Sequence, residues 1–257
     1  GNYKSSEFYE GETYDATVDL SKVSWHKAGR ANPGINPKIE AEYGAPVRAH
    51  EKFEPISINK SPSGELIYDL GQNFAGVIFA KIKNADEGQK IIFRHAEVLM
   101  DGELFTEPLR TAKQEAIYIC KAGEQEYSPS LTYMGFRYVG VRGIEAKNIE
   151  LKGVALYSEI RQHGRFKCSN ELINKLQSNI LWGTKSNFVD IPTDCPQRDE
   201  RLGWTGDIAL FSPTAVWNFD ISRFLEKWLK DVQTDQVRGG GIPMIIPAVK
   251  VYWQMEL

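Results

Sequence analysis

The chain has 257 residues, 42% of them hydrophobic, which is enough to bury one sizeable core or two modest ones. Its formal net charge is −3 and its acidic and basic residues are mixed, so no basic stripe predicts nucleic-acid binding. No apolar run approaches the ~20 residues of a membrane helix and no signal peptide is visible, so we expect no membrane partner, and the compartment, cytoplasmic or periplasmic, stays open.

Cysteine and histidine are sparse. Cys120, Cys168 and Cys195 are far apart and form no C-x-x-C pair, so we expect buried free thiols rather than a disulfide framework. The four histidines are scattered along the chain. The sequence therefore predicts neither a metal site nor a cofactor.

The early part of the chain ends in a segment rich in proline and glycine. Residues 31–46 include Pro33, Pro37 and Pro46, which oppose helix and central strand alike. We expect an extended linker that crosses a surface.

From about residue 47 to residue 162 the pattern is typical of β-strands. Short β-branched and aromatic runs are separated by Gly, Asp and Asn, as in an antiparallel sandwich. We expect Gly71-Gln72-Asn73 to end one of these strands. The predicted strands cover residues 46–51, 65–70, 77–82, 89–97, 116–121, 136–142 and 149–158.

After residue 163 the apolar period changes to that of helices. A first helix follows a cap at Ser169 or Asn170, with its apolar stripe over 172–182. A second helix covers 208–217, where Pro213 should bend it or lie in its first turn. A third covers 221–232, and its stripe predicts core packing. The Gly-rich stretch 238–243 predicts the loop after it.

A charged loop, residues 190–207, separates the first two helices. It has the sequence D-I-P-T-D-C-P-Q-R-D-E-R-L-G-W-T-G-D, and its prolines and glycines exclude a continuous helix. Five carboxylates, two arginines and one tryptophan fall within these 18 positions. Loops supported by rigid elements are where binding and catalytic groups tend to lie.

The composition of this loop suits acid catalysis on a sugar. Closely packed carboxylates raise one another's pKa values and arginines lower them, so one acid can stay protonated near neutral pH. A general acid needs that proton for a leaving oxygen. A tryptophan among such groups also offers a face for a sugar ring. The alternative is a solvated loop that caps the next helix with Thr205 or Asp207 and forms weak surface ion pairs.

Residues 194–207, D-C-P-Q-R-D-E-R-L-G-W-T-G-D, closely resemble the signature of inverting bacterial α-L-rhamnosidases at fourteen consecutive positions. The resemblance implies that Glu200 is the general acid that protonates the glycosidic oxygen. It implies a rhamnose-binding set made of Asp194, Arg198, Trp204 and Asp207. Asp199 and Arg201 belong to the same motif, and we expect structural roles for them.

Other phrases resemble the domains that precede the catalytic barrel in this family. Residues 8–16 are similar to the end of a small N-terminal β-domain, and residues 68–76, 94–99 and 133–139 to the β-sandwich domain. The resemblance implies an α+β multidomain fold, with an antiparallel β-sandwich before the first helices of an incomplete (α/α)6 barrel. The expected domains are 1–46 (end of the N-terminal β-domain, and linker), 47–162 (β-sandwich) and 163–257 (start of the barrel).

The implied function is hydrolysis of terminal α-L-rhamnosyl residues from glycosides or polysaccharides with inversion. Inversion needs a general base in addition to Glu200, and in the family this carboxylate lies near the far end of the barrel. We therefore expect a fragment that lacks the base and is inactive alone. Apolar side chains that face the missing part of the barrel would promote self-association. We expect Leu172, Phe211, Phe224 and Trp228 to lack partners in this way.

Two other functions are compatible with the sequence. One is a carbohydrate-binding β-sandwich with a structural helical tail, which would bind sugar around Phe74, His95 or Tyr133. The other is a different glycosidase or phosphorylase that carries a related acid loop on an (α/α)6 barrel.

Overall fold

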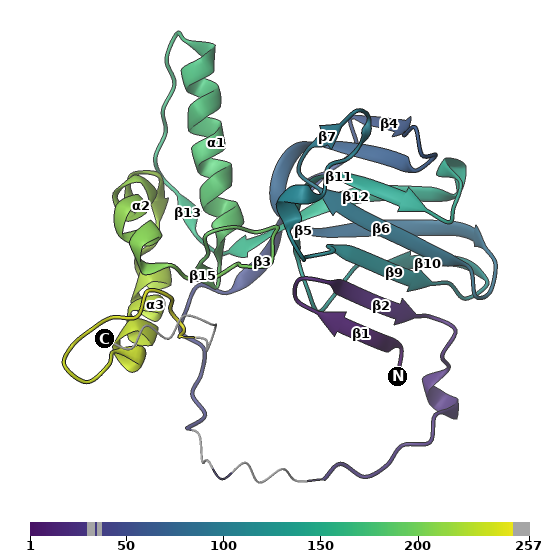
Figure 1. Cartoon of the computed structure of the whole chain (residues 1–257), viewed down its shortest axis with the longest axis horizontal. Helices are drawn as coiled ribbons and strands as arrows, with labels where there is room; N and C mark the ends of the chain where they lie inside the picture. The colour runs from purple at the N-terminus through teal and green to yellow at the C-terminus, as the bar shows by residue number, and fades with distance from the viewer. Residues whose placement is uncertain (30–33, 35–37, 249–257) are drawn as a thin grey trace.

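The computed structural model describes residues 1–29, 34 and 38–248, and it consists of an all-β part beside a helical part (Figure 1). This arrangement confirms the predicted α+β class, with the sandwich first and the helices after it. The predicted linker 31–46 lies partly outside the described residues. No helix among the described residues is both long and apolar enough to span a bilayer.

Ten strands form one curled sheet in the order β1-β2-β9-β6-β11-β5-β12-β3, with β4 and β10 also paired to β5. All pairings in this sheet are antiparallel except β2 with β9. The strands are β1 (Tyr3–Glu7), β2 (Gly11–Asp15), β3 (Val47–Phe53), β4 (Ser57–Lys60), β5 (Leu66–Ala85), β6 (Lys90–Ala96), β9 (Glu115–Ile119), β10 (Gly123–Tyr127), β11 (Met134–Arg142) and β12 (Ile149–Ser158).

Strand β5 joins the two layers of the sandwich. Its first half pairs with β4 and β11, and its second half pairs with β10 and β12. The expected break at Gly71-Gln72-Asn73 is wrong, because β5 runs through it without ending. Gly71 has φ +75°, and the register against β11 shifts between Phe136 and Tyr138 at this point. The turn-forming residues therefore make a bulge instead of a turn.

The other predicted strands are confirmed in β3, β6, β9, β11 and β12. Strands β1, β2, β4 and β10 were not predicted. β1 and β4 are exposed at every position, so they carry no apolar alternation for a sequence pattern to reveal. Short elements complete the chain, namely β7 (Leu99–Met100), β8 (Glu103–Leu104), β13 (Arg161–Gln162), β14 (Phe188–Val189), β15 (Ile191–Pro192), β16 (Phe219–Asp220), and the 3-10 turns η1 (Leu20–Lys22), η2 (Glu107–Leu109) and η3 (Ala146–Asn148).

The three predicted helices are confirmed as α1 (Glu171–Asn187), α2 (Thr205–Asn218) and α3 (Ser222–Asp235). Asn170 is the cap of α1, since its side chain accepts a hydrogen bond from the Leu172 N–H at 3.0 Å. Pro213 lies inside α2, beyond its first turn. The Ala209 carbonyl, which a residue at 213 would normally bond, accepts instead from Ser212 Oγ at 3.4 Å.

The apolar helix faces divide into covered and uncovered parts. Phe224 and Trp228 were expected to lack partners, but both are buried, and the Phe224 ring stacks on Phe188 with centroids 4.4 Å apart. Leu172, in contrast, is 82% exposed. The loop after α1 supplies Phe188, so α3 packs against a segment that periodicity alone does not identify.

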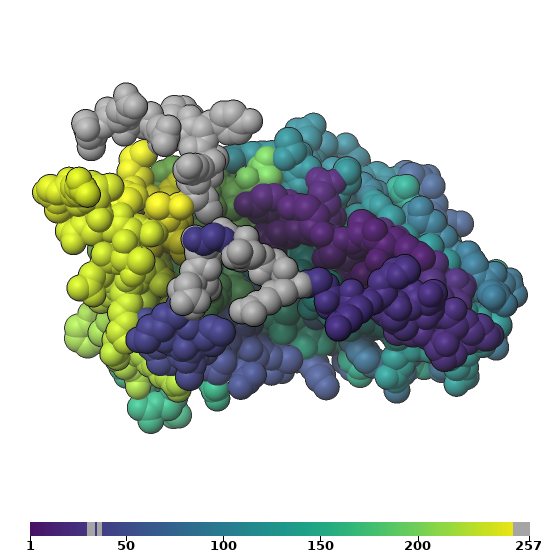
Figure 2. Space-filling model, turned by 90° about the horizontal axis from the view of Figure 1, so that it is seen from below, coloured from purple at the N-terminus to yellow at the C-terminus, as the bar shows by residue number. Residues whose placement is uncertain are grey.

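The N-terminal segment lies across the sandwich, and residues 38–46 reach the helices (Figure 2). The Tyr43 carbonyl accepts from Arg223 Nε at 2.7 Å, and Lys230 Nζ lies 3.6 Å from the centre of the Tyr43 ring. The three cysteines are free thiols, as predicted, although Cys168 is only half-buried. The contacts of Tyr43 with Arg223 and Lys230 link residues 38–46 to helix α3.

Candidate active-site loop

The charged loop between α1 and α2 is closed at its neck by backbone and side-chain bonds. The hairpin of β14 and β15 turns at Asp190, which has φ +68°. Asp194 then donates its N–H to the Leu202 carbonyl at 3.0 Å and accepts the Leu202 N–H on Oδ1 at 2.8 Å. These two bonds fix residues 194–202 as a closed loop, which we call the acid loop.

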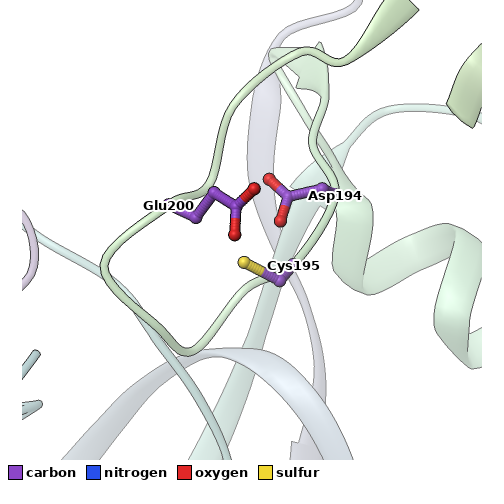
Figure 3. A group of neighbouring side chains, drawn as sticks. All are labelled: Asp194, Cys195 and Glu200. Atoms are coloured by element: carbon purple, nitrogen blue, oxygen red, sulfur yellow. The ribbon is translucent and has the colours of Figure 1, made fainter. Parts of the chain in front are cut away.

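Two carboxylates in the acid loop face one another across a guanidinium. Arg198 donates Nη2–H to Asp194 Oδ2 at 3.1 Å and Nε–H to Glu200 Oε2 at 2.9 Å. Figure 3 shows the carboxylates of Asp194 and Glu200 pointing toward each other, with the Cys195 thiol beside them. The structure thus brings three of the five predicted site residues into one cluster.

The two oxygens of Glu200 have different surroundings. Oε2 accepts from Arg198 and also from Arg110 Nη1, at 3.1 Å. Oε1 accepts no hydrogen bond from the residues that the structure describes. The Glu200 side chain is 17% exposed. One oxygen is therefore held by two cations while the other stays available to a ligand.

Asp194, Cys195 and Glu200 place one potential metal-ligand atom each within 4.8 Å of one another. A metal ion would nevertheless fit poorly. Burial raises the pKa of the Cys195 thiol to about 12, so the thiol keeps its proton and is a weak ligand. Arg198 already donates hydrogen bonds to both carboxyl groups. The chemistry of this donor set favours an internal ion pair.

Asp207 lies in the first turn of α2 and lines an open pocket of about 470 Å³ with Asp194. The pocket lies between α1 and α2, and most of its wall is apolar, including Ile180, Phe188 and Phe211. Arg198, Glu200 and Trp204 are not on this wall. The predicted residues therefore form two adjoining groups that share Asp194.

Trp204 has the N-cap position of α2, and no side chain caps that helix. The alternative in which Thr205 or Asp207 caps it is wrong, because Trp204 holds the cap position and the Thr205 hydroxyl donates to the Met244 carbonyl at 3.1 Å. Trp204 pairs with Ile245 in a single β-bridge. Its indole Nε1 is buried and has no hydrogen-bond partner among the described residues.

Arg201 has the structural role expected of it. Its guanidinium is buried and donates to the carbonyls of Tyr133 at 2.7 Å and of Phe8 at 3.1 Å, and to Gln114 Oε1 at 3.3 Å. These partners come from the N-terminal segment and from the sandwich, so Arg201 anchors the acid loop to the β part.

Sequence reasoning missed the contacts that reach the acid loop from far along the chain. Arg110 binds Glu200, and Thr111 Oγ1 donates to Asp199 Oδ2. The Tyr9 hydroxyl donates to the Glu200 carbonyl at 2.7 Å. These partners are separated by 88 to 191 positions. No local pattern in the sequence signals such pairs.

The sugar site proposed on the sandwich is not formed. Phe74, His95 and Tyr133 are all buried, with at most 7% of any of them exposed. Phe74 packs on Phe53 and Phe136 in the core. A sugar cannot reach these side chains, so the prediction that they form a sugar site is wrong.

Two family models match the chain. Residues 161–257 match the bacterial alpha-L-rhamnosidase 6 hairpin glycosidase domain, and residues 59–157 match the bacterial alpha-L-rhamnosidase concanavalin-like domain. Among curated proteins, an alpha-L-rhamnosidase of Formosa agariphila is 39% identical over 97% of the chain, and one of Streptomyces avermitilis is 36% identical over 97%. The chain spans only 28% and 25% of these two relatives.

Solved structures of similar proteins agree in fold. The alpha-L-rhamnosidase of Streptomyces avermitilis complexed with L-rhamnose superposes with a TM-score of 0.89, at 36% identity over 97% of this chain and 25% of that one. The enzyme of Aspergillus terreus gives a TM-score of 0.86 at 40% identity, over 96% of this chain and 30% of that one.

Proposed function

Because the chain belongs to the bacterial α-L-rhamnosidase family, we propose that it supplies the acid side of an active site that hydrolyses terminal α-L-rhamnosyl residues with inversion. The substrate is a rhamnose-containing glycoside or polysaccharide. The observation that carries the proposal is the cluster of Asp194, Arg198 and Glu200 beside a pocket that Asp194 and Asp207 share.

Glu200 is the general acid in this proposal. Its Oε1 has no partner among the described residues and carries the proton that goes to the glycosidic oxygen. As that proton arrives, the bond between the anomeric carbon and the oxygen breaks, and its electron pair stays with the leaving alcohol. Water adds to the opposite face of the anomeric carbon and loses a proton to a general base.

Four residues bind the rhamnosyl ring. Asp194 and Asp207 accept hydrogen bonds from sugar hydroxyls, Arg198 donates to them, and the Trp204 ring supplies an apolar face. Support comes from the position of Asp194, which contacts Arg198 and also lines the pocket. A rhamnose in that pocket would lie against apolar side chains of α1 and α2, which suits the methyl group of this deoxy sugar.

In this proposal the general base is none of the carboxylates that the structure describes. An inverting enzyme needs its base ~6.5–9.5 Å from the acid, with room for water between them. Asp194 is engaged by Arg198 and by the Leu202 N–H, so it is not free for that role. The chain alone should therefore bind rhamnose without hydrolysing rhamnosides. Turnover by the purified chain that Glu200→Gln abolishes would contradict a missing base.

Calorimetric titration of L-rhamnose tests the site. The chain should bind with a millimolar dissociation constant, a common affinity scale for a small polar ligand with few contacts. Trp204→Ala should abolish the heat of binding. Trp217→Ala is the matched control, because Trp217 lies on α2 and is 80% exposed. Equal loss of binding in both variants, or unchanged binding in both, would count against a sugar site at Trp204.

A further inference from the structure

One segment of the sandwich, residues 106–114, packs against the acid loop. Arg110 Nη1 lies 3.1 Å from Glu200 Oε2 and 3.8 Å from Asp199 Oδ1. The adjacent Thr111 hydroxyl donates to the other Asp199 oxygen. Two consecutive residues of the sandwich thus bind two consecutive acids of the loop.

The backbone of this segment is held in an uncommon conformation. Arg110 has φ +58° and ψ −116°, and Gln114 has φ +48°. Positive φ is unfavourable for side chains with a Cβ and persists where surrounding contacts enforce it. Here Leu109 and Ala112 are buried on either side of Arg110. The Gln114 amide exchanges hydrogen bonds with the Gly135 backbone at 2.8 and 3.1 Å. These contacts therefore hold the backbone of Arg110 in one position relative to the acid loop.

We propose that Arg110 is a positioning residue for Glu200, and this inference rests on the general-acid role proposed above. Arg110 and Arg198 both bind Oε2, which turns Oε1 toward the leaving oxygen and confines the transferable proton to it. The sandwich is then part of the catalytic apparatus although it touches no reacting atom.

The guanidinium also acts on the charge that the reaction creates. When Oε1 gives its proton to the glycosidic oxygen, the carboxyl group becomes a carboxylate. The Arg110 guanidinium, which lies 3.1 Å from Oε2, stabilises that negative charge as it develops. The benefit is largest for a leaving group that depends on protonation, such as an alkyl or sugar alcohol. It is small for a 4-nitrophenyl group, which departs as a stable anion.

The test compares leaving groups in the full-length gene product. Arg110→Gln should lower kcat on methyl or disaccharide rhamnosides by roughly tenfold, a part of the 10²–10⁴-fold that general acids contribute. The loss on 4-nitrophenyl rhamnoside should be under about threefold, with KM unchanged on both substrates. Arg110→Lys should restore part of the rate.

Two controls separate the possible failures. Arg161→Gln removes an exposed arginine that pairs with Asp220 at 3.7 Å and should change neither rate. Glu200→Gln should lose activity on the substrates with poor leaving groups. Equal losses on both substrates in Arg110→Gln, or losses no larger than in Arg161→Gln, would overturn the role of Arg110 while Glu200→Gln stays defective. If Glu200→Gln retains full activity, or the wild type hydrolyses neither rhamnoside, the proposed function fails and this inference with it.

Discussion

His95 is a fully buried imidazole on β6, close to where the sandwich meets the acid loop. Its Nδ1 lies 2.7 Å from the Gln114 carbonyl, and since a carbonyl only accepts, Nδ1 carries the proton of the neutral ring. The pKa of His95 is lowered from 6.5 to about 4, chiefly by burial, with a smaller contribution from nearby Arg201, while the hydrogen bond to Gln114 opposes the shift.

This shift makes stability depend on pH. Below pH 6.5 the unfolded chain binds a proton at His95 that the folded chain does not, so the free energy of unfolding falls as the pH drops from 6.5 toward 4. The loss amounts to at most about 3 kcal/mol, at 1.36 kcal/mol for each pKa unit. Urea unfolding at several pH values should show that the free energy of unfolding of His95→Gln depends less steeply on pH than that of the wild type. The exposed His163→Gln should retain the wild-type slope, and a wild-type slope in His95→Gln would contradict the prediction.

At the scale of single residues, the sequence predicts what is local. The cluster of Asp194, Arg198 and Glu200 forms within seven positions, so spacing alone favours its members lying together. The difference between the two oxygens of Glu200 could not be predicted. It depends on Arg110, which only the tertiary fold brings near.

At the scale of elements, β11 and the acid loop pack so closely at Gly135 that no side chain fits between them. A Cβ on Gly135 would lie 2.8 Å from Pro196 Cγ and 2.9 Å from the Gln197 N atom. Because one of these neighbours is backbone, the loop itself would have to move. The glycine thus allows the sandwich to touch the acid loop directly.

Gly135→Ala should therefore lower the free energy of unfolding by about 1–3 kcal/mol, the usual cost of overpacking, and weaken L-rhamnose binding. Gly183→Ala is the matched control for stability alone, because Gly183 lines the same pocket as Asp194. Gly183 lies on α1 with open space around its Cα, so alanine should stabilise the chain by up to ~1 kcal/mol through helix propensity. Chemical denaturation and calorimetry measure both effects. A Gly135→Ala protein as stable as the wild type would contradict the prediction, because the acid loop would then accommodate the extra methyl group at little cost.

Elements with strong periodicity could be predicted from the sequence, and those defined by their partners could not. Helix α3 follows its apolar stripe closely, since Phe224, Trp228 and Val232 are all buried. The continuity of β5 escapes a sequence argument, because Gly71-Gln72-Asn73 has the composition of a turn. Pairing with β11 on one side and β4 on the other makes it a bulge.

At the scale of the whole chain, the helical part exposes large apolar side chains. Leu172 is 82% exposed, Leu210 is 87% exposed and Trp217 is 80% exposed. Apolar surface of this kind is stabilised when another surface covers it. The predicted self-association through these faces stays a prediction, and α1 and α2 are where we expect it to occur.

Sedimentation velocity over a range of concentrations tests it. The wild-type chain should form dimers or larger species at micromolar concentrations, and Leu210→Glu with Trp217→Glu should shift it toward monomer, because burying two carboxylates is costly. Leu131→Glu is the control, since Leu131 is also exposed but belongs to the connection between strands β10 and β11. A monomeric wild-type chain at all concentrations would contradict the prediction.

The anchoring of Arg201 sets an order for folding during synthesis. Its carbonyl and amide partners belong to Phe8, Gln114 and Tyr133, all of which leave the ribosome before residue 201 is added. Domains generally fold as units, beginning with the N-terminal one. The sandwich can thus be folded while the acid loop is still being translated. The hydrogen-bond acceptors for Arg201 are then already in place when the loop folds. An amino-acid change that slows folding of the sandwich would then leave Arg201 without its acceptors, and the acid loop would be misplaced although its own sequence is unchanged.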